Sequence, residues 1–207
     1  MSTTVRELLE ERARAAHIAL ASETATRLER YFELLSHWNR TINLTSLPLE
    51  PPTEQSIDRL LIEPLRAVPL LASTVRVWFD LGSGGGSPAI PLQVAHPAHR
   101  LFMVESRERK AAFLREVIRD MKIQDAEVLC TRIESLVESR SRNGSADLVT
   151  VRAVRLSASL FSQLDGLLKV GGQAVLFGPG PQKLDLPRGL EIQYAEAPLL
   201  VVRRRTI

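Results

Sequence analysis

The segment VRVWFDLGSGGGSPAIP, residues 75–91, decides how the rest of the chain is interpreted. Its apolar run, residues 75–81, leads into the glycine-rich residues 82–86, and apolar residues return at Ala89 and Ile90. This order predicts a buried strand, a tight turn and the start of a helix. Glycine permits positive φ and a close approach of backbone to a ligand, and the free N–H groups of a helix start attract polar or anionic groups. The segment therefore predicts a loop that binds a nucleotide-like cofactor.

Strand-like and helix-like segments alternate from residue 75 onward. Strands are expected at residues 75–81, 100–105, 126–130, 148–152 and 173–177, with helices at 87–95, 107–121, 133–139 and 156–168. Gly171 and Gly172 predict a turn that opens the fifth strand. Residues 190–195 and 199–205, separated by Pro198, predict an antiparallel hairpin at the sheet edge. The pattern favours a doubly wound α/β domain, whose ligands bind at the carboxyl ends of the parallel strands.

The first part of the chain favours helices and contains no strand-like segment. Apolar residues near helical spacing, the first at Val5 and the last at Leu20, favour helical structure at the start of the chain. Ser22 is predicted to cap a second helix, and a third helix is expected to be disturbed at Pro64. We therefore predict a helical N-terminal extension, residues 1–72, followed by a Rossmann-like domain, residues 73–207.

Composition limits the class of protein. The chain has 207 residues, of which 44% are hydrophobic and 25% charged, and a formal net charge of +3; these values suit a globular protein and favour an anionic partner weakly. The N-terminus has no signal-peptide pattern, so a cytoplasmic protein is expected. The single Cys130 lies in an apolar run and predicts a buried, inert thiol, and no histidine spacing predicts a metal site. The candidates for phosphate contacts on the helix after residue 106 are Arg107, Arg109, Lys110, Arg115, Arg119 and Lys122.

Two cofactors compete for the glycine loop. A dinucleotide-binding loop has the pattern Gly-x-Gly-x-x-Gly. Gly82 and Gly84 match its first two glycines, but Ser87 stands in place of the third. Glu105 ends the second predicted strand, where a carboxylate can accept hydrogen bonds from ribose hydroxyls in either cofactor. Asp80 precedes the loop, as an acid often does in the Asp-x-Gly-x-Gly loops of methyltransferases, where it helps to hold the cofactor's amino group. Together with the antiparallel ending, these residues favour S-adenosylmethionine over NAD.

Five segments make the sequence resemble the bacterial 16S ribosomal RNA guanine-N7 methyltransferase family (RsmG, also called GidB). They are YFELLSHWNRTINLTSL (31–47), FDLGSGGGSPAIPLQV (79–94), VESRERKAAFLREV (104–117), CTRIESL (130–136) and DLVTVRAV (147–154). The Asn-Leu-Thr segment at Asn43 and the pair Arg152-Ala153 make the resemblance specific. It implies a class I Rossmann-like fold, with a mostly parallel seven-stranded sheet, and methyl transfer from S-adenosylmethionine to N7 of a guanine in 16S rRNA.

The resemblance also implies roles for individual residues. Arg152 and Asn43 are the implied catalytic residues, and Asn39 and Thr45 border the same pocket. The implied cofactor-binding residues are Asp80, Gly82, Gly84, Ser87, Glu105, Ile133, Glu134 and Arg152. Arg152 has an alternative, structural role as the partner of Asp147 or Glu134. The expected partner is 16S rRNA or the small ribosomal subunit, bound by a monomer, without a metal and without a membrane.

The sequence departs from the family pattern at several positions. Ser87 replaces a larger apolar residue and Ala89 a glycine, and Phe177 replaces a lysine. The segment expected as His-x-x-Asp-Ser has instead Leu60, Glu63 and Pro64. Several of these positions are where the family would contact substrate. A methyltransferase for another RNA or a small molecule, and a catalytically silent RNA-binding relative, are therefore the alternatives.

Overall fold

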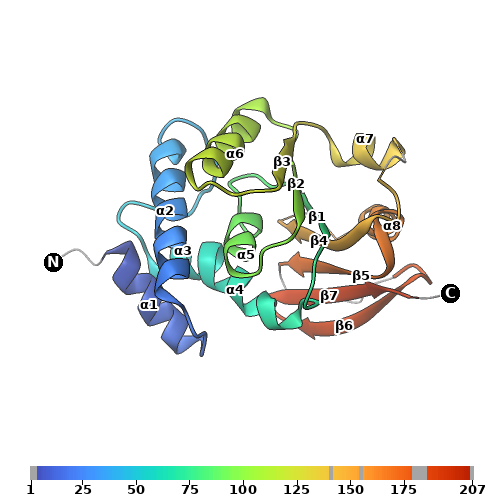
Figure 1. Cartoon of the computed structure of the whole chain (residues 1–207), viewed down its shortest axis with the longest axis horizontal. Helices are drawn as coiled ribbons and strands as arrows, with labels where there is room; N and C mark the ends of the chain where they lie inside the picture. The colour runs from blue at the N-terminus through green and yellow to red at the C-terminus, as the bar shows by residue number, and fades with distance from the viewer. Residues whose placement is uncertain (1–3, 140–141, 154–155, 179–185, 206–207) are drawn as a thin grey trace.

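The computed structural model describes residues 4–139, 142–153, 156–178 and 186–205 (Figure 1). Within these residues, seven strands form one sheet in the order β3-β2-β1-β4-β5-β7-β6. The strands are β1 (Val77–Leu81), β2 (Arg100–Val104), β3 (Ala126–Leu129), β4 (Ala146–Arg152), β5 (Leu168–Phe177), β6 (Leu190–Glu196) and β7 (Leu199–Arg204). Strands β1 to β5 pair in parallel, whereas β7 is antiparallel to both β5 and β6. The predicted mostly parallel, seven-stranded sheet with a C-terminal hairpin is confirmed.

Helices cover both faces of the sheet. They are α1 (Val5–Ala15), α2 (Ser22–Asn39), α3 (Glu54–Ile57), η1 (Asp58–Ile62), α4 (Glu63–Ala67), η2 (Val68–Leu70), α5 (Ala89–Ala95), α6 (Glu108–Asp120), α7 (Ile133–Glu138) and α8 (Ala158–Leu167). Helices α7 and α8 pack in one apolar cluster, and α5 and α6 pack in a second, on the opposite face (Figure 1). None of the helices in the described ranges has the length and apolar character that a membrane span requires.

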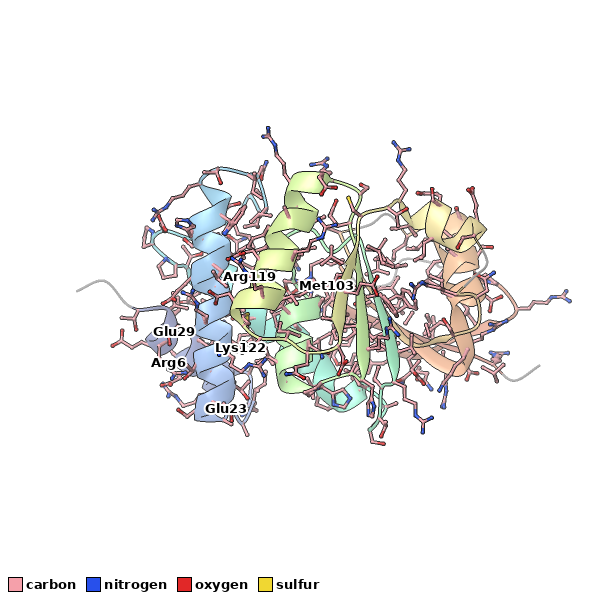
Figure 2. The ribbon with its side chains drawn as sticks, turned by 45° about the horizontal axis from the view of Figure 1, so that its top comes forward. Arg6, Glu23, Glu29, Met103, Arg119 and Lys122 are labelled. Carbon is pink, nitrogen blue, oxygen red and sulfur yellow. The ribbon has the colours of Figure 1, made fainter. Side chains whose placement is uncertain are left out.

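The N-terminal helices share a core with the sheet. The cluster that contains Phe113 of α6 also contains Leu9, Leu28 and Leu61 from the first three helical segments. Figure 2 shows α2 and α6 side by side. Arg30 of α2 joins them by donating two hydrogen bonds of 2.8 and 2.6 Å to Asp120 at the end of α6. The helical extension therefore forms one wall of the molecule.

Three local predictions were wrong. The N-cap of α2 is Ala21, without a side-chain hydrogen bond, and Ser22 is already helical. Gly172 lies within β5, because β4 pairs with this strand on both sides of it, at Leu168 and at Gln173, with an irregular register between. A Cβ on Gly172 would come within 2.6 Å of the Ala146 carbonyl oxygen on β4, so the position requires glycine. Cys130 is exposed, because it follows β3, the edge strand of the sheet. The last two depend on how strands that are distant in sequence pair in the sheet.

Pro64 changes the helix around it, as the sequence predicts. The segment from Glu54 to Ala67 stays helical, but it widens to a π-turn before the proline, where the Glu63 N–H donates to the Asp58 carbonyl. Proline has no N–H to donate. It therefore cannot pair with the carbonyls of Arg59 and Leu60, which stand five and four residues before it.

Candidate functional site

The glycine loop is fixed at the carboxyl edge of the sheet. The N–H groups of Gly82 and Ser83 donate to the Val104 carbonyl at the end of β2, at 2.8 and 3.0 Å, and the Gly86 N–H donates to the Ser83 carbonyl at 2.7 Å. Gly82, Gly84 and Gly86 have φ of 74°, 53° and 91°. Because only glycine adopts such angles readily, these residues allow the tight path of the loop between β1 and α5.

A cavity of about 490 Å³ lies against this loop. Its walls come from the glycine loop, the loop after α2, the π-turn, the start of α6 and the end of β4. The lining residues are Leu35, Leu44, Thr45, Ser46, Leu47, Arg59, Leu60, Gly82, Ser83, Gly84, Gly85, Ser87, Glu105, Arg107, Lys110, Arg152 and Ala153. Thus Gly82, Gly84, Ser87, Glu105 and Arg152, all predicted from the sequence, meet at one cavity.

Glu105 is held rigidly at the end of β2. Its residue exposure is 7%, and its two carboxylate oxygens accept backbone hydrogen bonds from Gly84 at 2.9 Å and Arg107 at 2.8 Å. A carboxylate oxygen has more than one lone pair. Glu105 can therefore accept further hydrogen bonds from a ligand without releasing the loop.

Asp80 lies beneath the loop, outside the lining residues, with a residue exposure of 1%. Its Oδ1 accepts a hydrogen bond of 2.5 Å from Thr150, whose own oxygen accepts one of 2.8 Å from the Trp78 indole. Its Oδ2 is buried and has no partner among the described residues. Burial raises the pKa of Asp80 to about 6. A buried, unpaired carboxylate oxygen marks a place for a positively charged or donating ligand group.

Arg152 ends β4 and projects toward the π-turn. Its Nη1 donates to the Arg59 carbonyl and, at 3.2 Å, to Ser87 Oγ, and its Nη2 lies 3.3 Å from a Glu63 carboxylate oxygen. Its guanidinium also lies over the Phe177 ring, 4.8 Å from the centroid. Burial lowers the pKa of Arg152 to about 10, so the side chain remains charged at neutral pH.

The predicted alternative partners of Arg152 were wrong. Asp147 pairs with Lys169 instead, and Glu134 makes no ion pair with any residue in the described ranges. Glu63 is the carboxylate that Arg152 contacts. No sequence pattern indicated this pair, since the two residues lie 89 positions apart.

Several of the departures from the family pattern meet at this arginine. Ser87 accepts from Arg152 and donates to the Leu60 carbonyl at 2.7 Å, Glu63 pairs with Arg152, and Phe177 stacks on it. Positions that looked scattered along the chain therefore form one contact network.

Helix α2 and the loop after it support the other wall. The buried Tyr31 hydroxyl donates to the Gly85 carbonyl at 2.7 Å. Asn39 accepts from the N–H groups of Leu44 and Thr45 at 2.9 and 3.0 Å, which shapes the loop that lines the cavity. Asn43 is exposed and is not among the lining residues. The structure thus gives no support to its predicted catalytic contact.

Two predicted adenine-flanking residues lie away from the cavity walls. Ile133 and Glu134 begin α7, where Ile133 packs against the apolar cluster below the helix and Glu134 is exposed. The cavity instead contains Arg107 and Lys110, which the sequence indicated as candidates for phosphate contacts. Their signal was the cluster of basic residues on this helix.

Two other members of that basic set are paired on the helix surface. Arg115 lies 3.0 Å from Glu108, and Arg119 lies 2.5 Å from Glu116. The side chains of Arg107 and Lys110 form no ion pair with a residue in the described ranges. These two cations therefore remain available to an anionic ligand. The described residues contain no group of three or more His, Cys, Asp or Glu side chains placed to hold a metal ion.

Comparison with known proteins identifies the family. The family model for rRNA small subunit methyltransferase G (GidB) matches residues 24–185. The ribosomal RNA small subunit methyltransferase G of Neisseria meningitidis is 36% identical over 177 residues, which cover 83% of this chain and 81% of the relative. The chain belongs to this family. The corresponding protein of Syntrophotalea carbinolica is 34% identical over 158 residues, which cover 76% and 70% of the two chains.

Solved structures support the same fold. The putative methyltransferase yhhF from Escherichia coli superposes with a TM-score of 0.54 at 13% identity, covering 69% of this chain and 83% of that one. The TYW2 protein of P. horikoshii, solved in complex with MeSAdo, gives a TM-score of 0.51 at 16% identity, covering 69% and 60%. These likenesses confirm the Rossmann-like methyltransferase fold.

Family membership confirms several predictions. The chain is an S-adenosylmethionine-dependent methyltransferase of the RsmG/GidB family, whose reaction is methylation of guanine N7 in small-subunit rRNA. The cavity suits this cofactor, because it combines a glycine loop, the Glu105 carboxylate and, beneath them, the unpaired Oδ2 of Asp80. The NAD alternative is therefore set aside.

Proposed function

We propose that the 490 Å³ cavity is the site of methyl transfer, with S-adenosylmethionine along the glycine loop and a guanine of 16S rRNA entering beside Arg152. The observation that carries this proposal is the convergence of Gly84, Glu105 and Arg152 on one cavity at the carboxyl edge of the strands, above the orphaned Asp80 oxygen.

The cofactor side of the cavity follows from its donors and acceptors. Glu105 would accept hydrogen bonds from the ribose hydroxyls, and the Gly82 and Gly84 backbones would contact the methionine part without obstruction by a Cβ. Asp80 would hold the cofactor's amino group, and Ser87 would border the methionine side. Ile133 and Glu134 are proposed to flank the adenine through backbone groups, from beyond the described cavity walls.

The reaction needs positioning more than proton transfer. S-adenosylmethionine supplies an electrophilic methyl group when bound. Guanine N7 carries a free lone pair, so no proton has to leave before attack, and the reaction requires no general base. Orienting two reactants in this way can contribute about 7–11 kcal/mol to the lowering of the barrier. The protein's task is therefore to hold guanine N7 in line with the methyl group.

The substrate side is assigned to the cationic residues. Arg152 would donate to guanine O6, the acceptor next to N7, which leaves the N7 lone pair for the methyl group. Arg107 and Lys110 would contact RNA phosphates, which makes RNA binding salt-dependent. Asn43, exposed beside the cavity, is proposed to contact the RNA backbone instead of the reacting atoms.

The proposed partner is 16S rRNA within the small ribosomal subunit, bound by a monomer in the cytoplasm. One chain supplies every wall of the described cavity, which is consistent with a monomeric enzyme. The chain is further proposed to consist of a helical extension, residues 1–72, that borders the RNA side, and a methyltransferase domain, residues 73–207.

A methyl-transfer assay tests the function. Small subunits from cells that lack the gene should take up labelled methyl from S-adenosylmethionine, at a guanine that mass spectrometry locates. Glu105→Ala should weaken cofactor binding in calorimetry by at least about tenfold, because hydrogen bonds to a charged group are lost. Glu127→Ala on β3, which removes a half-exposed partner of Arg100, is the matched control. Cofactor binding without any label in the RNA would refute the proposed acceptor.

A further inference from the structure

The π-turn before Pro64 supplies acceptors to the cavity. Pro64 has no N–H for the carbonyls of Arg59 and Leu60. Side chains from two other elements use these carbonyls, since Arg152 donates to the Arg59 carbonyl and Ser87 donates to that of Leu60 at 2.7 Å. Widened turns of this kind often occur at functional sites. Because the proline has no N–H, carbonyls of this helical segment can accept hydrogen bonds from Ser87 and from Arg152 at the end of β4.

Glu63, the residue before this proline, lies behind the cavity wall. It is not a lining residue, and its side chain is 12% exposed, as is that of Arg152. Its two oxygens lie 2.9 and 3.1 Å from Arg59 Nη1, and one of them lies 3.3 Å from Arg152 Nη2. Glu63 therefore touches the two arginines that line the cavity at this point, without reaching the cavity itself.

The Arg152 guanidinium is contacted through both of its terminal nitrogens, whereas its buried Nε has no partner among the described residues. An arginine has five N–H donors in a fixed plane. Arg152 donates three hydrogen bonds, to the Arg59 carbonyl, to Ser87 Oγ and to Glu63. The Phe177 ring covers one face of the guanidinium plane. Loss of the Glu63 charge would leave a buried cation with a weaker partner and a freer orientation.

We propose that Glu63 is a positioning residue for methyl transfer, which acts by holding Arg152 against the π-turn that Pro64 creates. This inference rests on the proposed function of the cavity and extends it. Glu63 itself makes no contact with cofactor or guanine. It orients the arginine that meets the base, so it affects the chemical step more than the binding of the cofactor.

Two variants test this inference by separate measurements of kcat, KM for RNA and cofactor affinity. Glu63→Gln should lower kcat roughly 10-fold to 100-fold, since small misplacements of a positioning group have effects of this size. Its affinity for S-adenosylmethionine in calorimetry should stay within about twofold of the parent, because no direct contact is lost. Pro64→Ala restores a helix N–H that competes for the two carbonyls, and it should lower kcat while the melting temperature stays equal or rises.

Asp58→Asn is the matched control. Asp58 belongs to the same π-turn and also pairs with an arginine, but its partner is Arg12 at 2.6 Å, outside the cavity lining. Its kcat should equal that of the parent. If Glu63→Gln keeps the kcat of this control, or exceeds it, the inference is overturned.

Arg152→Lys separates this inference from the proposed function. If this variant loses kcat and the Glu63 and Pro64 variants do not, the site proposal stands and the positioning role of Glu63 is wrong. If Arg152→Lys transfers methyl groups at the parent rate, the role assigned to Arg152 fails, and that of Glu63 fails with it.

Discussion

At the scale of single residues, Asp80 has the most consequential environment. Its carboxyl group is buried among β-strands with one oxygen unpaired, and burial raises its pKa from 3.8 to about 6. The folded protein therefore binds the Asp80 proton more tightly than the unfolded chain does. By linkage, the free energy of unfolding falls as pH rises from about 4 to about 6, by an amount on the order of 3 kcal/mol. Without its ligand, the enzyme maintains an ionised carboxylate at a cost in stability.

Asp80→Asn should remove this cost. In the absence of cofactor, the variant is expected to have a higher free energy of unfolding than the parent at pH 7, by up to about 3 kcal/mol, and the difference should vanish near pH 4. Its affinity for S-adenosylmethionine should fall, because the proposed partner of the amino group loses its charge. Urea unfolding at both pH values and calorimetry at pH 7 measure these effects. A stability gain of equal size at both pH values would contradict the pKa argument.

At the scale of elements, the glycine loop depends on α2. Gly85 and Gly86 pack against this helix, since a Cβ on Gly85 would come within 3.2 Å of Leu35 and one on Gly86 within 3.3 Å of Tyr31. The Tyr31 hydroxyl also donates to the Gly85 carbonyl. An N-terminal helix thereby fixes the loop proposed to bind the cofactor.

Tyr31→Phe tests this dependence. The change leaves the Gly85 carbonyl without its side-chain donor in a buried position, which should lower the free energy of unfolding by about 1–3 kcal/mol. It should also weaken cofactor binding, since the loop becomes less fixed. Tyr194→Phe is the control, because the Tyr194 hydroxyl bonds to Glu196 at an exposed position of β6. Thermal melting and calorimetry compare the two, and equal stability of both variants would argue against a supporting role for Tyr31.

The sequence predicts elements better than the contacts between them. Alternating apolar segments define the sheet, and the glycine loop with Glu105 defines its ligand edge, because both signals are local. The pairing of Glu63 with Arg152 and the exposure of Cys130 depend on which segments become neighbours in the fold. Pro64 illustrates this limit. A proline at this position predicts a disturbed helix, but it does not indicate that Ser87 and Arg152 donate to the backbone carbonyls that lack a proline N–H partner.

At the scale of the whole molecule, the shared core argues for one cooperative unit. Residues of α1, α2 and the π-turn belong to the same apolar cluster as β1, α5 and α6. The chain contains two tryptophans, one in each proposed part. Trp38 of α2 packs on Phe113 of α6 at a centroid distance of 5.9 Å, and Trp78 is buried in β1. Each tryptophan therefore reports on one side of the shared core.

Single-tryptophan variants can test whether the helical extension unfolds together with the sheet. In Trp38→Phe, fluorescence follows β1, and in Trp78→Phe it follows α2. Within each variant, the urea midpoint from fluorescence should coincide with the midpoint from far-UV circular dichroism, as a two-state transition requires. Trp78→Phe also loses the hydrogen bond from the Trp78 indole to Thr150, so its fluorescence and circular dichroism midpoints should both fall by the same amount. If the Trp38 fluorescence in Trp78→Phe instead changes at a lower urea concentration than the circular dichroism, the helical extension unfolds as a separate unit. The part of the cavity lining that the extension supplies could then move away while the sheet stays folded.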